Sequence, residues 1–588
     1  AGGSTGINFA VSNTSTGSSG GQGTLGKPSC ARSANAFTVC SATYTAPSTI
    51  SSTTATYVVG TVGTSSSKDY TEVLLNTAGV NSDPSDHGTQ QKTPIVLGSS
   101  GGNNTDYDTT SSNNISDCCG GTLGALLKDA SGNQYLLSNN HVLAKSDQAT
   151  KGDTIIQPGL VDAACKPYGN GGSELPVGTL TGWLALSSNS TNADAAIAKV
   201  DAGMVNANGA ILELGALQPD GTLAAAPPGI SSSGGKGEAP TVGMTVAKSG
   251  RTTGLTCASI SAIDASVQVS YFKDCGETQS YMTKTYTNQV EITGNQFSDA
   301  GDSGSLVVDT TNGEPVGLFF AGGVDNSGKT QAIASPAPDL LNELNSQLGG
   351  TYTFVGTTDH AVSCLNYGAD AVSAAQARTL SGPEITRAET ALGSARQLVN
   401  PSLGVLGVAT GKSSDEPGKA AVLVYLSADS KAKIPATIEG VRTEVIPTTT
   451  GAVATGAAPL TPFAAIAVPE LPAASLTQAI AAKRRIAASL MQQNPAFFGV
   501  AVGQSYDDPR EAALVIYVDR TQVPANLPTT IGGLRTRYII MSRLHVTRAY
   551  ASPIPMRSRC MLQNARPASP AKLDLQELNA PQPLNLQY

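Results

Sequence analysis

The stretch from residue 94 to residue 350 consists of short apolar runs that are rich in β-branched residues and bounded by Gly, Asn, Asp or Ser. Examples are PIVLG, YLLSN, DAAIAKV, VQVSYF and GSLVVD. Many short strands with turn residues between them are typical of all-β sandwiches and barrels. A single helix is expected in this stretch, over 337–347 at its end. The sequence therefore predicts a mainly β domain.

The C-terminal part of the chain contains an internal repeat. GVATGKSSDEPGKAAVLVYL at 407–426 aligns with GVAVGQSYDDPREAALVIYV at 499–518, and IPATIEGVRT is likewise followed later by LPTTIGGLRT. A segment of helical composition and spacing precedes each copy, at 384–398 and at 474–492. We expect two small α+β domains, each made of a helix followed by three strands.

A chain of 588 residues is too long for one hydrophobic core, and its composition shifts along its length. We expect a Ser/Thr/Gly-rich β-leader or flexible leader (1–93), the β domain (94–350), a linker (351–383), the first repeat (384–446), an Ala/Pro-rich linker (447–473), the second repeat (474–548) and a Pro-rich tail (549–588).

The low proportion of charged residues favours an exported protein. It is 14%, against roughly 25% in typical soluble proteins. The chain begins at Ala1, as a mature product does after removal of a signal peptide. No apolar run approaches the ~18 residues that a membrane helix needs. We therefore expect a secreted, extracellular bacterial protein without a membrane span.

Charge is distributed unevenly between the two parts of the chain. Residues 1–350 hold 28 acidic and 15 basic residues, whereas residues 351–588 hold 16 acidic and 21 basic ones. This asymmetry indicates a domain boundary and would allow the two parts to attract each other. The basic residues are scattered rather than clustered, so nucleic-acid binding is not expected.

Nine cysteines and only four histidines, with no CxxC motif, favour disulfides over a metal site. Cys30 with Cys40, and Cys257 with Cys275, are close enough in sequence to close hairpin-sized loops. The adjacent Cys118 and Cys119 must project to different sides, so we expect them to have different partners. An odd number leaves one thiol free or available to another chain.

The motif GDSGS at 301–305 contains the candidate nucleophilic serine. A serine between glycines and after an aspartate suits a strained turn that exposes a hydroxyl beside backbone N–H groups. A nucleophilic serine needs a base, which in turn needs an orienting acid. His141 follows an apolar strand, and Asp194 precedes one. The order His, Asp, Ser on a β background is that of the chymotrypsin-like arrangement.

With these motifs, residues 94–350 resemble chymotrypsin-fold, trypsin-like serine peptidases of bacteria. The matching phrases are LSNNHVLA, DAAIA, KSGRTTG, GDSGSLVVD and VGLFFAGG. The resemblance implies a double β-barrel that needs no cofactor and no metal. It also implies that Ser303 is the nucleophile, His141 the base and Asp194 its orienting acid. The N–H groups of Gly301 and Ser303 would form the oxyanion hole.

The resemblance also implies that Asp302 is buried beside a cation that shapes the oxyanion loop. The chain has no basic activation site close to the start of the β domain. Lys248 or Arg251 is the expected partner, because an unpaired buried carboxylate is costly. The domain would then need no cleavage to form the loop.

Two stretches of the sequence depart from the family pattern. Phe297 stands six residues before Ser303, where basic-specific peptidases carry an acid, and Asp299 is the only acid nearby. In the strand that lines the cleft, Phe320 replaces a serine and Ala321 a large aromatic residue, while Gly322 keeps that wall open. We expect cleavage after a medium or large apolar residue.

The sequence thus predicts a secreted serine endopeptidase that acts on proteins or peptides. The alternative is an extracellular structural or assembly protein, built on a latent or inactive protease-like domain and able to self-assemble through its leader, tail or repeats. GVATGKS at 407–413 is not a phosphate loop, because Leu406 stands where the first glycine should be. A triad with an open cleft would favour the enzyme, whereas a cleft filled by the leader or tail would favour a latent enzyme or a scaffold.

Overall fold

A computed structural model gives the fold of strand segments between residues 7 and 75 and of residues 87–551, except 219–221, 278, 327, 365–379, 428, 449–470 and 547. Two compact units are present. One combines Ala1–Asn81 with Ile554–Tyr588, and the other is Ser82–Pro553. Among the described residues, no helix has the length and apolar character that crossing a membrane requires.

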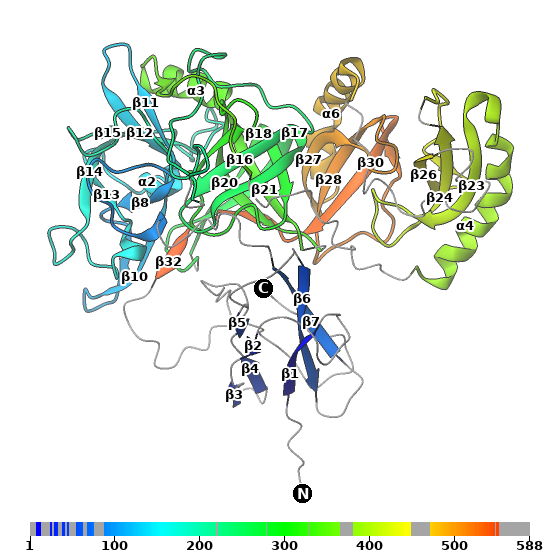
Figure 1. Cartoon of the computed structure of the whole chain (residues 1–588), viewed down its shortest axis with the longest axis horizontal. Helices are drawn as coiled ribbons and strands as arrows, with labels where there is room; N and C mark the ends of the chain where they lie inside the picture. The colour runs from blue at the N-terminus through cyan, green and yellow to red at the C-terminus, as the bar shows by residue number, and fades with distance from the viewer. Residues whose placement is uncertain are drawn as a thin grey trace, which may run out of the picture. The chain divides into compact units, whose positions relative to one another are not determined.

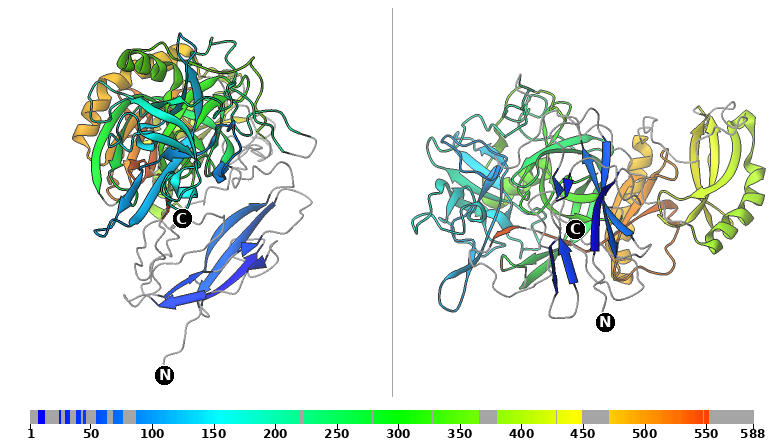
Figure 2. Two further views of the ribbon diagram at one scale, coloured as in Figure 1. Left: turned by 90° about the vertical axis from the view of Figure 1, so that its left-hand side faces the viewer. Right: turned by 60° about the horizontal axis from the view of Figure 1, so that its bottom comes forward.

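The described segments of the first unit form β-strands, as expected of a β-leader rather than a flexible leader. Strands β1, β6 and β7 form an antiparallel sheet and lie side by side in Figure 2. Strands β3 and β4 pair with Cys30 opposite Cys40. The bounds are β1 (Ile7–Ser12), β2 (Thr24–Leu25), β3 (Ser29–Arg32), β4 (Thr38–Ser41), β5 (Tyr44–Thr45), β6 (Thr54–Val62) and β7 (Lys68–Leu75).

A closed antiparallel barrel begins the second unit. Its sheet runs β11-β12-β15-β14-β13-β8-β10. The barrel closes because β10 continues through Gly124 into β11, so that both ends of the sheet belong to one bent strand. The bounds are β8 (Ser99–Asn103), β9 (Tyr107–Thr109), β10 (Ile115–Leu123), β11 (Ala125–Lys128), β12 (Gln134–Ser138), β13 (Thr154–Gln157), β14 (Leu175–Trp183) and β15 (Ala196–Val200).

A second antiparallel barrel follows, in the order β16-β19-β20-β21-β18-β17, and the pairing of β16 with β17 closes it. The mainly β fold and the predicted double barrel are therefore confirmed (Figure 1). The bounds are β16 (Thr245–Gly250), β17 (Gly254–Phe272), β18 (Ser280–Gly294), β19 (Leu306–Asp309), β20 (Pro315–Val324) and β21 (Thr330–Pro336).

Helix α3 (Ala337–Leu348) is the helix expected at the end of the β domain. It ends at Gly349, whose φ of 72° is in the left-handed region that glycine tolerates. Its buried face includes Leu340 and Leu344, which belong to the same apolar core as the interior of the first barrel. Strand β22 (Thr353–Phe354) then returns to pair with β11.

Three disulfides join distant segments and correct part of the sequence prediction. Cys257 bonds to Cys364 and Cys275 to Cys119, so the predicted Cys257–Cys275 pair is wrong. The hairpin argument failed because β17 continues straight beyond Cys257 to Phe272 and carries the two cysteines far apart. The third disulfide joins Cys118 to Cys165, so the adjacent cysteines have different partners, as expected.

Both C-terminal segments have the same order of elements. The two sheets run β23-β24-β26-β25 and, locally, β27-β28-β30-β29, each with one parallel pair. The expected helices correspond to α4 and α6. The bounds are α4 (Gly382–Ala395), β23 (Val405–Lys412), β24 (Ala420–Ser427), β25 (Thr437–Ile438), β26 (Val441–Thr448), α6 (Ala473–Gln493), β27 (Phe497–Gln504), β28 (Ala512–Asp519), β29 (Thr530–Ile531) and β30 (Leu534–Met541).

The second of these sheets is continuous with the second barrel. Strand β27 pairs antiparallel with β17, so β17 belongs to both (Figure 1). Helix α6 adds a buried contact, because Lys483 Nζ donates to Ser266 Oγ at 2.7 Å and lies 3.5 Å from an Asp264 oxygen. A shared strand and a buried lysine bind the second repeat tightly to the barrel.

The chain then runs back to the barrels in two short strands. Strand β31 (Leu544–His545) pairs parallel with β17 and antiparallel with β20. Strand β32 (Ala549–Ala551) pairs antiparallel with β10 of the first barrel. Figure 1 shows the orange β32 beside the blue and cyan strands of the first barrel, so residues from near both ends of the second unit meet.

The two repeats contact each other through reciprocal hydrogen bonds. Ser413 Oγ donates to Asp507 at 2.8 Å, and the equivalent Ser505 Oγ donates to Asp415 at 2.5 Å. Arg442 and Arg535 likewise each donate to a threonine carbonyl oxygen of the other repeat at 3.0 Å. The same surface of each copy therefore faces the other, as in a twofold dimer interface.

Glu444 is fully buried in this interface beside Ser414, whose hydroxyl donates to it at 2.8 Å. Burial, reinforced by the nearby Asp507 carboxyl, raises the pKa of Glu444 to about 9. The side chain is therefore protonated near neutral pH in the folded protein.

We predict that the Glu444→Gln variant loses part of the pH dependence of stability. From about pH 4.3, the unfolded value, up to pH 9, the folded protein holds a proton that the unfolded chain releases. The free energy of unfolding therefore falls as pH rises, by about 1.4 kcal/mol per pH unit from this group. Hydrogen exchange of the β26 amides between pH 6 and pH 8 measures the slope. The exposed Glu389→Gln is the matched control, and equal slopes for wild type and Glu444→Gln would contradict the prediction.

Candidate active site

His141 lies where the first barrel faces the second. Strand β12 ends at Ser138, and the chain turns at Asn139 into the short helix α2 (Asn140–Leu143). The imidazole is fully buried. Its Nδ1 lies 2.6 Å from Asp194 Oδ2, and the His141 N–H donates to the other carboxylate oxygen at 3.3 Å.

Asp194 is also fully buried, and the polar turn before β15 holds it. Asn139 Nδ2 donates to the Asp194 carbonyl oxygen at 2.7 Å, which ties the two turns together. Two donors to one carboxylate fix the imidazole orientation, because Nδ1–H can point only toward Asp194.

Tyr271 supplies a further hydrogen bond that the sequence analysis missed. Its hydroxyl donates to Asp194 Oδ2 at 2.9 Å and lies 2.5 Å from the Tyr286 hydroxyl. Burial raises the pKa of both tyrosines well above 10, so both hydroxyls keep their protons. The Phe320 side chain has no hydrogen-bond donor, and Tyr271 reaches the carboxylate from the long strand β17.

Ser303 sits in a sharp turn between β18 and β19, and 2% of its surface is exposed. Gly301 and Gly304 flank it with φ of 97° and 96°, a region that L side chains rarely adopt. At Gly304 a Cβ would lie 2.1 Å from Ser138 Oγ, so the first barrel approaches this turn too closely for any side chain. The glycines of GDSGS are therefore required by the turn and by the contact between the barrels.

The Ser303 hydroxyl donates to the Phe320 carbonyl oxygen at 3.5 Å. His141 Nε2 is buried and has no hydrogen-bond partner among the described residues. The serine and histidine are thus not hydrogen-bonded in this structure. Hydrogen bonds of this kind are often long in resting sites and shorten when substrate is bound.

Thr122 binds the carbonyl groups of Gly301 and Ser303, the two residues predicted to form the oxyanion hole. Thr122 of β10 donates its N–H to the Ser303 carbonyl oxygen and its hydroxyl to that of Gly301, both at 2.9 Å. Among the described residues, the N–H groups of Gly301 and Ser303 have no acceptor. Two N–H groups in one rigid turn therefore remain for a ligand.

Asp302 is fully buried and paired with Lys248 rather than with Arg251. The Lys248 Nζ lies 3.3 Å from Asp302 Oδ2, and neither side chain is exposed. Thr252 and Thr253 donate their backbone N–H groups to Asp302 Oδ1, at 2.8 and 3.1 Å. Burial lowers the pKa of Lys248, and the Asp302 carboxylate opposes that change.

Arg251 has a different partner. Its guanidinium binds Asp162 of the first barrel at 2.7 and 2.5 Å, with both side chains 17% exposed. Of the two basic residues expected beside Asp302, Lys248 is therefore the partner, and Arg251 bridges the two barrels.

The predicted cleft residues occupy different places. Phe297 is fully buried in the apolar core of the second barrel. Phe320 and Ala321 are buried in a second cluster that also holds Tyr271. Gly322 is half-buried and lies opposite His545 of β31. The C-terminal strand therefore covers the wall that Gly322 was expected to leave open.

A cluster of Asp106, Cys119 and Cys275 brings together three atoms of the kinds that ligate metals. The two sulfurs form a disulfide with each other, and disulfide sulfurs are not thiolates. The carboxylate of Asp106 binds Arg548 instead. This cluster therefore does not fit a metal ion.

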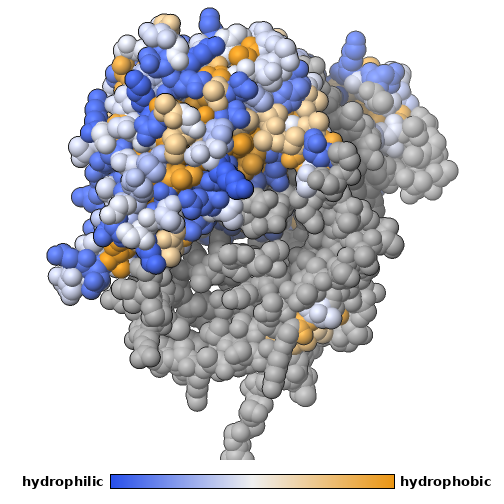
Figure 3. All heavy atoms as spheres, turned by 60° about the vertical axis from the view of Figure 1, so that its left-hand side comes forward, coloured by the Kyte–Doolittle hydropathy of each residue, from blue (hydrophilic) through white to orange (hydrophobic). Residues whose placement is uncertain are grey.

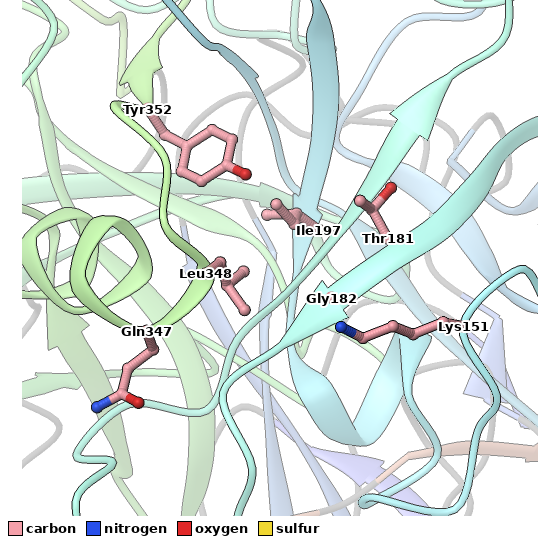
Figure 4. A pocket seen from close by; sticks show the side chains of 7 residues that line it. All are labelled: Lys151, Thr181, Gly182, Ile197, Gln347, Leu348 and Tyr352. Carbon is pink, nitrogen blue, oxygen red and sulfur yellow. The ribbon is translucent and has the colours of Figure 1, made fainter.

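Two cavities lie away from Ser303. One of about 140 Å³ lies between β14, β15 and the end of α3, where Tyr352 and Leu348 face Ile197 and Thr181 (Figure 4). Another of about 220 Å³ lies beside α6. The described surface in Figure 3 mixes hydrophilic and hydrophobic residues. Neither cavity brings a nucleophile and a base together.

The chain matches no protein-family model and no curated protein. Solved structures that align with it include a Nocardiopsis protease, 17% identical with a TM-score of 0.26, over 41% of this chain and 96% of that one. A Cellulomonas bogoriensis chymotrypsin is 18% identical with a TM-score of 0.24 over 41% and 96%. A catalytically inactive tobacco etch virus protease, complexed with substrate, is 12% identical with a TM-score of 0.17 over 40% and 87%.

We predict that Lys248→Met destabilises the barrels far more than Arg251→Met. Removing Lys248 leaves the Asp302 carboxylate buried without its cation, which costs about 3–5 kcal/mol. Arg251 is partly exposed, so its loss costs less. Thermal unfolding of the two single variants measures the difference. An equal or smaller loss for Lys248→Met would show that the pair does not hold the Ser303 turn.

Proposed function

We propose that the double barrel is a serine endopeptidase in which Ser303, His141 and Asp194 act as nucleophile, base and orienting acid. The observation that carries this proposal is the buried His141–Asp194 contact of 2.6 Å beside a serine in a two-glycine turn. A buried, oriented imidazole with one free nitrogen is what activation of a serine requires. The three disulfides favour an oxidising, extracellular location.

In this mechanism the Ser303 oxygen attacks the carbonyl carbon of the peptide bond while His141 Nε2 takes the hydroxyl proton. The carbon–nitrogen bond then breaks, and His141 returns the proton to the leaving amine. Water, activated by the same base, releases the acyl group from Ser303. The N–H groups of Gly301 and Ser303 stabilise the oxyanion, at about 3 kcal/mol for each donor.

Asp194 and Tyr271 prepare the imidazole for this step. The carboxylate accepts from Nδ1, which leaves Nε2 as the basic nitrogen and stabilises the imidazolium that forms. The Tyr271 hydroxyl keeps the carboxylate in place without neutralising it, because the raised pKa of the tyrosine prevents proton release.

A fluorophosphonate probe, which reacts only with activated serines, tests the proposal. We predict that long exposure of the full chain labels Ser303 and that Ser303→Ala removes the label, as peptide mass spectrometry will locate. The exposed Ser190→Ala is the matched control and should label as the wild type does. Absence of label on Ser303 in every form of the chain would favour the assembly protein over the enzyme.

We predict that Tyr271→Phe lowers the rate at which Ser303 is labelled by about 10- to 100-fold. The variant removes one hydrogen bond to a charged group, worth about 1.5–3 kcal/mol. The acidic limb of the pH–rate profile should shift as well, because Asp194 then interacts differently with the imidazole. Unchanged rate and profile would mean that Tyr271 only fills space, and unchanged melting temperature controls for folding.

A further inference from the structure

Residues after the second repeat lie across the candidate active site. On the side of the second barrel, β31 inserts between β17 and β20, and Val546 N–H donates to the Ser270 carbonyl oxygen at 3.1 Å. His545 pairs antiparallel with Gly322, two residues after Phe320, whose carbonyl accepts the Ser303 hydroxyl. This part of the chain is therefore added as a strand to the wall beside the serine.

On the side of the first barrel the chain continues in β32, antiparallel to β10. Ala549 is opposite Gly120, two residues from Thr122, which hydrogen-bonds to the carbonyls of Gly301 and Ser303. A Cβ on Gly301 would lie 2.8 Å from the Ala549 Cβ. Residues 544–546 and 548–551 thus lie on opposite sides of Ser303, and Thr547 between them is outside the described residues.

Two apolar side chains anchor this segment on the second barrel. Leu544 and Val546 are 0% and 2% exposed, in the cluster that also contains Phe320, Ala321 and Tyr271. A peptide that binds as an added strand gains affinity from main-chain hydrogen bonds and specificity from pockets for alternate side chains. Leu544 and Val546 are alternate residues and fill such a pocket.

An arginine anchors the segment on the first barrel. The Arg548 guanidinium is 5% exposed and lies 3.2 and 3.3 Å from the two oxygens of the buried Asp106. It also donates to the Asp274 carbonyl oxygen at 3.0 Å. Burial raises the pKa of Asp106, and Arg548 opposes that rise, so the site is built for a cation.

We propose that Leu544–Val546 and Arg548–Ala551 occupy the substrate cleft as a substrate strand does, so that the intact chain is a latent peptidase. The Asp106 site is then a subsite for the arginine side chain of a peptide substrate, on the first-barrel side of Ser303. This inference rests on the proposed function, because it names the occupant and a specificity site of the same cleft.

The test compares labelling rates of Ser303 in full-length chains. Val546→Asp places a charge in the apolar cluster, and Arg548→Glu places a carboxylate against Asp106. We expect both variants to react with the fluorophosphonate at least tenfold faster than the wild type. Arg485→Glu, on the exposed face of α6, makes the same charge change away from the cleft and should react at the wild-type rate.

A peptide added in trans tests occupancy without relying on the folding of one variant. The sequence LHVTRAYA, residues 544–551, should slow the labelling of Val546→Asp at least fivefold at saturation. The matched peptide LHVTEAYA lacks the arginine and should bind at least tenfold more weakly. Circular dichroism and melting temperature establish that each variant is folded.

The outcomes separate the two proposals. Equal labelling rates in wild type, Val546→Asp and Arg548→Glu, with no effect of the peptide, would overturn the latency while leaving the serine peptidase intact. Equal inhibition by the two peptides would overturn the arginine subsite. Absence of Ser303 label in every folded form would overturn the proposed function and this inference together.

Discussion

The candidate site depends on one contact between the barrels, made by Thr122. This buried residue of β10 donates to the carbonyl oxygens of Gly301 and Ser303 and accepts the Arg251 N–H at 3.0 Å. Because His141 and Asp194 belong to the first barrel and Ser303 to the second, their separation is set by this seam. The absence of a side chain at Gly304 allows the close approach. The two barrels thus bring together candidate catalytic groups that no single barrel holds.

Buried charges around the seam restrict its geometry further. The Lys248–Asp302 pair holds the Ser303 turn, and the Arg548–Asp106 pair holds the C-terminal segment against the first barrel. A desolvated charge is tolerated only when a partner and further hydrogen bonds compensate for the lost water. Each of these pairs therefore favours one arrangement of the chain over its alternatives. The same reasoning applies to the interface between the repeats, where Glu444 avoids the cost by remaining protonated.

Strands β27, β31 and β32 connect the second C-terminal repeat to both barrels. Strand β27 extends the sheet of the second barrel, and the chain that follows pairs with β20 and then with β10 of the first barrel, which in our proposal places it in the cleft. A repeat fixed to β17 delivers that segment at high effective concentration, so weak strand pairing suffices to fill the cleft. Under our proposal, residues 544–546 and 548–551, at the boundary between repeat and tail, fill the site.

Sequence alone determined the features that depend on neighbouring residues. Alternating β-branched runs predict strands, the glycines of GDSGS predict the turn, and the repeated segments predict a repeated order of elements, because each follows from local backbone preference. Only the tertiary structure decided the disulfide partners of Cys257 and Cys275, the contact of Tyr271 with Asp194, and the pairing of His545 with Gly322. These contacts join residues far apart in the chain, and their energies depend on burial and distance, which exist only once the barrels have closed.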